Sequence, residues 1–324
     1  MLQRKGEGRR PSSTVRKFTD PDEYAAAIRG ANAELAITGR GRFAAEITRI
    51  DLHRLWMQRL SDNLPRVSHF AIESGRAIVT FRTQPGPSLL SGGAEMLPTN
   101  LVRHGQGGSS FQRPSGSAWR GAMSLPVADA VAIGETLGGR DLTQPKQTLI
   151  VTPAPSAMAK LQRLHAAAGQ LAEDAPEIIA HPEAARGLEQ ALIEALVGCL
   201  DQGAASEDRV AQRHHSIVMR RFRRVLEEDP SQPLYVTEIC KMIGVSDRTL
   251  EMCCQEQLGM GPKRYLVLRR LNLARRALRE AAPDTTTVTD VATQYGFWHF
   301  GRFAGVYCSL FGESPSATLH RQSE

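Results

Sequence analysis

The spacing of hydrophobic residues changes near residue 156 and divides the chain into two parts. In the first part, apolar and polar positions alternate over short segments, with the period of two that is typical of β-strands. In Ala45–Leu52, Ile47 shares one face with Arg49 and Asp51, and Ile50 shares the other with Thr48 and Leu52. Further strands are predicted at Arg66–Ile72, Ala77–Thr83, Phe111–Arg113 and Ala118–Leu125. Clusters of Gly, Pro and Ser separate them, which favours an antiparallel sandwich or barrel.

After residue 156 the apolar residues recur at helical spacing. Met158, Leu161 and Leu164 lie three apart. A broader apolar face follows, made of Leu188, Leu192, Ala195, Leu196 and Cys199. A third, charged helix is predicted over about residues 206–228, and Asp229-Pro230 ends it. The leucine-rich face has two interpretations: it packs on the upstream sandwich, or it forms the interface of a homodimer.

These patterns predict an α+β multidomain protein with four regions. We expect a flexible segment at residues 1–40, a sheet domain at 41–152, a helical linker or dimerisation segment at 153–216, and an all-α domain at 217–321. A short helix over Pro21–Ile28, capped by Asp20, is an option within the first segment. The basic residues Arg4, Lys5, Arg9 and Arg10 are not followed by an apolar stretch, so we expect no secretory signal there.

The C-terminal region contains an internal repeat. One copy begins V-T-E-I-C-K-M-I-G-V-S at Val236, and the other begins V-T-D-V-A-T-Q-Y-G-F-W at Val288. Gly296 follows Gly244 by 52 residues, and Pro315 follows Pro262 by 53. The shared register predicts two units of one structure, the first at about 236–259 and the second at about 288–312.

The first copy has the pattern of a helix-turn-helix. Thr237 is a candidate cap for a helix whose apolar positions Ile239, Met242 and Ile243 face inward. Gly244 ends that helix because glycine tolerates positive φ, and Val245 fills the angle between the helices. Ser246 caps the second helix, which Leu250 and Cys254 bury. The residues left for DNA, as the first turn of a recognition helix, are Ser246, Asp247, Arg248, Thr249 and Glu251.

The second copy repeats this arrangement. Its supporting helix is built by Thr289, Val291, Ala292 and Tyr295, with the turn at Gly296 and Phe297. Phe303 and Tyr307 anchor the recognition helix. The residues left for DNA are Trp298, His299, Gly301 and Arg302. An arginine such as Arg302 can pair bidentately with guanine, while Trp298 is either a base or sugar contact or a half-buried cap.

An amphipathic helix is predicted between the two units. Its apolar positions include Tyr265, Leu268, Leu271 and Leu278, and its other face carries Arg269, Arg270, Arg276 and Arg279. Basic faces are usually only solvated, but beside two DNA-reading units we expect Arg269, Arg270 and Arg276 to meet phosphates. A rigid connector would place the recognition helices about one DNA turn, ~34 Å, apart.

Composition narrows the choice of partner. The net charge of +6 and the pI of about 9.3 favour a polyanion. From Ile217 onward, 15 Lys and Arg stand against 12 Asp and Glu, a small excess that suits specific readout better than a non-specific architectural DNA binder. Five cysteines without a C-x-x-C pair indicate neither a disulfide framework nor a zinc site. No apolar stretch approaches the ~18–20 residues of a membrane span.

The C-terminal region resembles the AraC/XylS family of bacterial transcription regulators. The resemblance lies in R-L-N-L-A-R-R-A-L at Arg270–Leu278, in Gly296-Phe297, and in F-G-E-S-P at Phe311–Pro315, and it covers about residues 217–320. It implies two helix-turn-helix subdomains, sequence-specific binding to double-stranded promoter DNA, and activation through RNA polymerase. Met252 and Cys254 stand where such proteins tend to have an Arg and an aromatic residue, which leaves Arg248 as the basic candidate of the first recognition helix.

The N-terminal half is similar to the cupin-like effector-binding sandwich often joined to that domain, in the order of its elements and in Phe81-Arg82-Thr83 and Leu97-Pro98-Thr99. Metal-binding cupins use a closely spaced H-x-H, whereas His53, His69 and His104 lie far apart, so no metal is expected. A small-molecule effector remains possible in a barrel of this size. Its candidate lining residues are His69, Arg82, Arg103 and Trp119, each with core packing or a solvated strand face as the alternative.

The sequence therefore predicts a cytoplasmic bacterial regulator, associated with the nucleoid through DNA, that responds to an unknown small-molecule effector. No enzymatic activity, cofactor or membrane partner is expected. The alternative is an enzyme with an appended helix-turn-helix, such as an alkyl-acceptor repair protein. That chemistry needs an activated cysteine, but all five cysteines lie in predicted helices, mostly at apolar positions.

Overall fold

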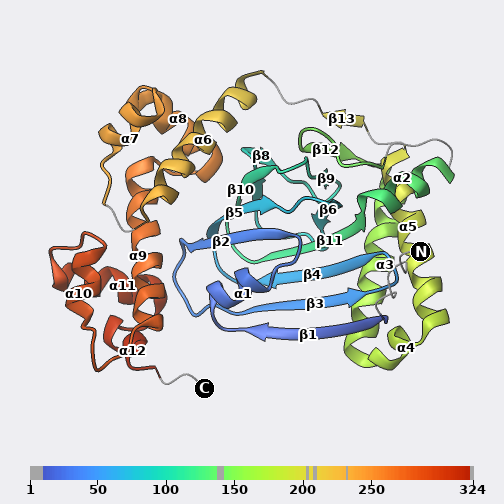
Figure 1. The fold of residues 1–324 in the computed structure, drawn as a ribbon, viewed down its shortest axis with the longest axis horizontal. Coiled ribbons are helices and arrows are strands. Elements are labelled where there is room, and N and C mark those ends of the chain that lie inside the picture. The colour runs from blue at the N-terminus through green and yellow to red at the C-terminus, as the bar shows by residue number, and fades with distance from the viewer. Residues whose placement is uncertain (1–9, 137–141, 202–203, 207–209, 231–232, 322–324) are drawn as a thin grey trace, which may run out of the picture.

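A computed structural model describes residues 10–136, 142–201, 204–206, 210–230 and 233–321. Most of the basic N-terminal tail, including Arg4, Lys5 and Arg9, and the start of the predicted helix at 206–228 lie outside these ranges. Two regions are visible in Figure 1, a sheet region flanked by helices and a helical region that contains the C-terminal third of the chain. No helix within the described ranges is long and apolar enough to cross a membrane.

The sheet region consists of two antiparallel sheets, as the sequence predicts. The larger sheet has the order β1 (Ser12–Phe18), β3 (Ala45–Asp51), β4 (Trp56–Asp62), β11 (Ala118–Pro126), β6 (Arg76–Arg82), β9 (Leu101–Arg103), β12 (Leu149–Thr152) and β13 (Ala204–Ser206). The smaller sheet has the order β2 (Ala31–Ile37), β5 (Arg66–Ile72), β10 (Ser109–Pro114), β7 (Leu89–Ser91) and β8 (Ala94–Glu95). All five strands predicted from alternation are present.

Helices cover the outer face of the larger sheet. After α2 (Val127–Thr136), the helices α3 (Pro155–Asp174), α4 (Pro176–Ala180) and α5 (Pro182–Asp201) pack against strands β1, β3, β4 and β6, where Met57 and Phe81 join Leu161 and Leu192 in one core. The leucine-rich face of α5 is buried in this core, and Leu192 and Cys199 are fully enclosed. The packing interpretation of that face is confirmed, and a homodimer cannot use it without opening the chain's own core.

The N-terminal segment is ordered from Ser12 onward, so the expectation of a flexible stretch at residues 1–40 is wrong for residues 12–37. Strand β1 pairs with β3 along its full length, and β2 pairs with β5. The short helix α1 (Pro21–Ala27) is confirmed, because Asp20 accepts hydrogen bonds from the backbone N–H groups of Asp22 and Glu23 at 2.9 and 3.0 Å. Tyr24 then enters the core with no exposed surface, which fixes the segment.

The helical region comprises α6 (Val210–Glu228), α7 (Val236–Ile243), α8 (Asp247–Leu258), α9 (Pro262–Glu280), α10 (Val288–Gln294), α11 (Phe300–Phe311) and α12 (Pro315–Leu319). Figure 1 shows α9 as a long rod, with α7 and α8 near one end and α10 and α11 near the other. Its 19 residues correspond to about 28 Å at 1.5 Å per residue. The two repeat copies are therefore held apart by one continuous helix.

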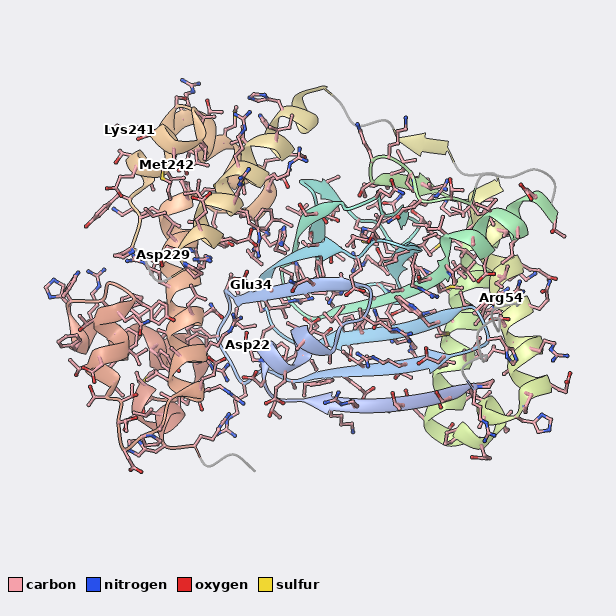
Figure 2. All side chains as sticks on the ribbon, viewed as in Figure 1. Asp22, Glu34, Arg54, Asp229, Lys241 and Met242 are labelled. Carbon is pink, nitrogen blue, oxygen red and sulfur yellow. The ribbon has the colours of Figure 1, made fainter. Side chains whose placement is uncertain are left out.

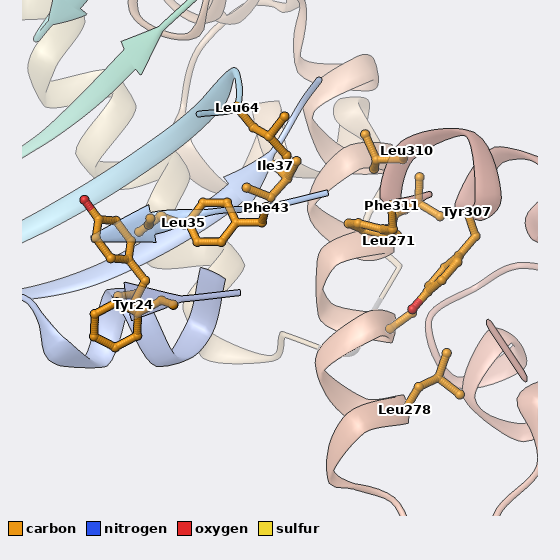
Figure 3. Close-up of a cluster of buried hydrophobic side chains, with 14 of the residues drawn as sticks. Tyr24, Leu35, Ile37, Phe43, Leu64, Leu271, Leu278, Tyr307, Leu310 and Phe311 are labelled. Carbon is orange, nitrogen blue, oxygen red and sulfur yellow. The ribbon is translucent and has the colours of Figure 1, made fainter. Parts of the chain in front are cut away.

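The two regions share a hydrophobic core. Ile37, Phe43 and Leu64 of the sheet region belong to the same buried cluster as Leu271 of α9 and Leu310 of α11 (Figure 3). Asn272 adds two hydrogen bonds to the backbone of Ile37, at 2.9 and 3.1 Å. The smaller sheet is thus packed between the larger sheet and the helices α6, α8 and α9.

Candidate nucleic-acid interface

The supporting helix of the first unit, α7, is capped two residues earlier than predicted. Tyr235 is the N-cap residue, and its backbone N–H donates to the Glu238 carboxylate at 2.8 Å. Thr237 is therefore not the cap, because Glu238 reaches back to satisfy the helix start. At the other end, Gly244 has φ of 73° and donates its N–H to the Cys240 carbonyl, which confirms the predicted turn.

The recognition helix of the first unit, α8, is anchored as predicted. The Ser246 hydroxyl accepts the Thr249 N–H at 3.1 Å, and Leu250 and Cys254 are completely buried. Ser246, Asp247, Arg248 and Glu251 are exposed, and Thr249 is half-buried. The first turn of α8 is thus available to a ligand.

Met242 departs from the expected inward orientation. It is 55% exposed, and Figure 2 shows it with Lys241 at the outer edge of the helical region. Ile239 and Ile243 bury the helix without it, because α7 has only eight residues and one narrow apolar stripe.

The second unit has the same construction. Thr287 caps α10: its hydroxyl accepts the Asp290 N–H at 3.1 Å, and Asp290 accepts the Thr287 N–H at 3.0 Å. Gly296 makes the turn with φ of 74°. Phe297 then packs against Phe303, with ring centroids 4.9 Å apart.

The first turn of α11 projects outward. Phe303 and Tyr307 are buried and hold the helix, as predicted. Trp298 is 69% exposed, which excludes the half-buried cap interpretation in this structure. The other predicted contact residues on this surface, all exposed, are His299, Gly301 and Arg302.

The arginines of α9 differ from the predicted phosphate contacts. Arg269 is 6% exposed and donates to the Leu226 carbonyl at 2.9 Å. Arg276 pairs with Asp22 of α1 at 2.5 Å, and Arg270 lies half-buried over the ring of Phe297. The prediction is wrong for Arg269 and Arg276 in this conformation, because this face of α9 packs against other parts of the chain.

Two other basic residues lie between the recognition helices. Lys263 and Arg264, at the start of α9, are exposed and line an open groove whose other walls include Glu251 of α8 and Val306 of α11. The sequence carries this signal as the K-R pair after Pro262, but the predicted basic face of the helix included only residues from Arg269 onward. Lys263 and Arg264 are more exposed than the three predicted phosphate contacts, Arg269, Arg270 and Arg276.

The predicted effector residues do not share a cavity. His69 lies on the outer face of the smaller sheet, where its ring packs on Phe111 and burial lowers its pKa to about 3. Arg82 is buried and donates to the carbonyls of Met96 and Pro87. Arg103 lines a pocket beneath α5, and Trp119 lines another beside Glu173 of α3.

The cysteines do not form a reactive site. Cys199, Cys240, Cys253 and Cys254 are buried, and burial is the main cause of a raised pKa at each thiol. Cys308 is exposed on α11. Within the described ranges, no three His, Cys, Asp or Glu residues are placed to hold a metal ion.

Residues 239–321 match a family model described as a helix-turn-helix domain. The matched segment begins in α7 and ends after α12, so it includes both units and the connecting helix. The chain's C-terminal region contains a helix-turn-helix domain. Within this domain, α8 and α11 are the second helices of the two units.

Curated relatives align with part of the chain. The probable thc operon regulatory protein of Rhodococcus erythropolis is 36% identical over 152 residues, which are 45% of this chain and 44% of that protein. The XylDLEGF operon transcriptional activator 3 of Pseudomonas putida is 36% identical over 104 residues, which are 31% of each chain. This chain thus spans less than half of the length of these relatives.

Among solved structures, the AraC-like transcriptional activator CuxR aligns over 86% of this chain and 99% of its own, with 14% identity and a TM-score of 0.42. ToxT from Vibrio cholerae aligns over 90% of this chain and 98% of its own, with 10% identity and a TM-score of 0.28. Both scores describe a loose overlap of folds.

Proposed function

We propose that this protein is a sequence-specific transcription regulator whose two recognition helices enter successive major grooves of promoter DNA. The observation that carries the proposal is the pair of exposed first turns, on α8 and α11, presented by two copies of one motif joined through a single helix. Exposed N-terminal turns are the part of a recognition helix that reaches base edges.

The second unit supplies the stronger base readout. Arg302 of α11 and Trp298, two residues before that helix, are both exposed, so a guanidinium and a large apolar surface can reach the groove together. On α8, Arg248 is the one basic residue among the exposed residues of the first turn, and Asp247 and Glu251 lie near it. We therefore assign sequence specificity mainly to α11. The helix α8 mainly positions the protein on the DNA and makes a smaller share of the base contacts.

The sheet region serves as a sensor for a small-molecule effector, and the curated relatives named as operon activators support activation through RNA polymerase. On this assignment residues 217–321 bind DNA, and the sandwich begins near residue 12 instead of 41. Within residues 153–216, the helices α3, α4 and α5 belong to the sheet region because they pack on its larger sheet. The site of action is the bacterial cytoplasm and its nucleoid. The buried thiols favour a regulator over an alkyl-acceptor enzyme.

Footprinting of the purified chain on the DNA upstream of its own gene and of neighbouring genes, at 50 and 200 mM salt, tests this function. Specific readout predicts two protected segments one helical turn apart that persist at the higher salt. Uniform protection that disappears between the two salt concentrations would indicate phosphate binding alone and contradict the proposal.

A further inference from the structure

Two arginines are buried between the sheets with one carboxylate. Arg66 of β5 has no exposed surface, and Arg120 of β11 is 5% exposed. Both pair with Asp62 of β4, which lies between them: Arg66 through a short contact to one carboxylate oxygen, and Arg120 at 3.4 Å to the other. Tyr24 donates its hydroxyl to the same carboxylate at 3.3 Å.

This cluster carries an unbalanced positive charge. Burial raises the pKa of Tyr24 to about 12, so the phenol is neutral. Two guanidinium groups therefore face one carboxylate, a formal charge of +1 in a place from which water is largely excluded. Burying an unpaired charge is costly, and native structures usually compensate it with an opposite charge.

The hydrogen bonds of the two guanidinium groups are also incomplete. Arg120 donates to the Gln112 side-chain oxygen at 3.0 Å, but its Nε–H meets no acceptor among the described residues. The Nε and Nη2 atoms of Arg66 are also buried without a hydrogen-bond acceptor among the described residues. Buried polar groups without partners are rare in folded proteins, so each one calls for an explanation such as a functional role or a bound water or ion.

A cavity adjoins this cluster. Arg120 and Gln112 form part of its wall, and most of the remainder is apolar, with Leu60, Phe70, Ile72 and Ile78 among the lining residues. The cavity is partly open to solvent, so a small molecule has a way in. Along β5, the alternation of side chains places Arg66 on the same face as Phe70 and Ile72.

We propose that the cavity between the sheets binds a small organic anion, whose carboxylate takes the free Nε–H of Arg120 beside the buried Arg66–Asp62 pair and whose apolar body lies against Leu60, Phe70 and Ile78. The proposal rests on the sensor role given to the sheet region above and names the chemical class that it senses. A guanidinium matches a carboxylate because two parallel N–H groups meet two oxygens.

Other ligand classes fit less well. A cationic molecule would meet Arg120 and Arg29, which both line the cavity, without a free carboxylate to receive it. Asp51 already pairs with Arg29, and Asp62 is shared by the two buried arginines. A neutral molecule would fill the apolar part but leave the +1 charge of the cluster uncompensated.

Calorimetric titration of the full chain with three molecules of similar shape tests the proposal: cyclohexanecarboxylate, cyclohexanecarboxamide and cyclohexylamine. Acetate and acetamide repeat the comparison of an acid with its amide, and both are small enough to enter any part of the cavity. The proposal predicts that each acid binds at least tenfold more tightly than its amide and that the amine does not bind. Amides that bind as tightly as their acids, or acids that do not bind to the folded chain, would overturn it.

The variant Arg120→Gln separates a ligand role from a structural one. It leaves Arg66 and Asp62 as a neutral pair, so we expect a melting temperature at or above that of the parent chain, together with loss of the preference for acids. Arg163→Gln on α3, an exposed site, removes the same charge and should leave acid binding unchanged. A folded Arg120→Gln variant that still prefers acids would contradict the assignment.

The same preparations can be tested for specific DNA binding, which keeps the two proposals distinguishable. Failure to bind acids with intact DNA protection would overturn the anion site alone. Failure of DNA protection with intact acid binding would overturn the regulatory function and leave the anion site in place.

Discussion

The guanidinium of Arg275 lies 2.9 Å from the carboxylate of Asp20, although 255 residues separate the two positions. Both side chains are buried, and Arg279 approaches the same carboxylate at 2.8 Å. Arg276 pairs with Asp22 alongside them, and Glu34 of β2 pairs with Arg223 of α6 at 2.6 Å. Figure 2 shows Asp22 and Glu34 on the side of the sheet region that faces the helices. A row of carboxylates thus joins the sheet region to the helical region.

Removing the central carboxylate of this row should destabilise the chain. Asp20→Asn leaves Arg275 buried with a weaker partner, Glu313 at 3.6 Å, and we expect a loss of about 3 kcal/mol in the free energy of unfolding. Urea unfolding measures this loss. The control is Glu183→Gln, whose partner Arg186 is well exposed, and there the change should be below about 0.5 kcal/mol. Equal losses in the two variants would show that the buried Asp20–Arg275 pair contributes no more to the free energy of unfolding than an exposed pair does.

Three buried histidines predict sensitivity to mild acid. Burial lowers the pKa of His69 to about 3, of His104 to about 4 and of His165 to about 3. Unfolded histidine binds a proton near pH 6.5, so unfolding takes up protons below that pH and stability falls as the pH falls. Each group contributes up to about 1.4 kcal/mol per pH unit.

The buried carboxylates Asp20 and Glu34 affect stability in a lower pH range than the histidines do. Burial alone would raise the pKa of Asp20, but the Glu23 N–H and Arg275 offset it and the pKa is lowered; Arg223 does the same for Glu34. Their stabilisation is present above about pH 4 and lost only below it. Urea unfolding at pH 7.5 and 5.5 should therefore show a loss due to histidine, and His165→Leu should make that loss smaller. An unchanged pH slope in this variant would contradict the assignment.

The fold followed from the sequence where a residue's role depends on its near neighbours. The turns at Gly244 and Gly296 need positive φ, and the repeat places both. Strand β4 was missed because Trp56, Met57 and Gln58 are all buried, which removes the alternation that reveals a half-exposed strand. Strands β7 and β8 have three and two residues, too few for any period to appear.

The site was harder to predict because the role of its residues depends on contacts between segments that are far apart in the sequence. Arg276 looks like a phosphate contact in its own helix, and only the approach of Asp22 from the other end of the chain changes that role. In the sheet region, Trp119 was selected where its neighbour Arg120 enters the cavity. A difference of one residue along a strand moves a side chain to the opposite face.

The thiols should differ sharply in their reaction with Ellman's reagent. Cys308 is exposed, whereas Cys199, Cys240, Cys253 and Cys254 are buried. We expect one equivalent to react quickly in the native chain and the other four only after guanidinium is added. Rapid reaction of two or more thiols would show that the core around α8 opens readily.

Arg302→Ala should weaken binding to the specific site by about 10- to 100-fold, because one bidentate contact to a base is worth ~1–3 kcal/mol. Binding to unrelated DNA should change much less. Gel-shift titrations on both DNAs measure this ratio. Arg163→Ala, on the exposed face of α3, removes an equal charge away from the recognition helices and serves as the matched control.

Hydroxyl-radical footprinting of the parent chain, Arg248→Ala and Arg302→Ala on one operator tests the central claim most directly. Two recognition helices in successive grooves predict two protected segments one turn apart in the parent chain. Arg302→Ala should weaken one segment and Arg248→Ala the other, with the smaller effect from Arg248. Loss of both protected segments together in each variant would contradict independent DNA contacts by α8 and α11. One continuous protected stretch that neither substitution changes would also contradict them.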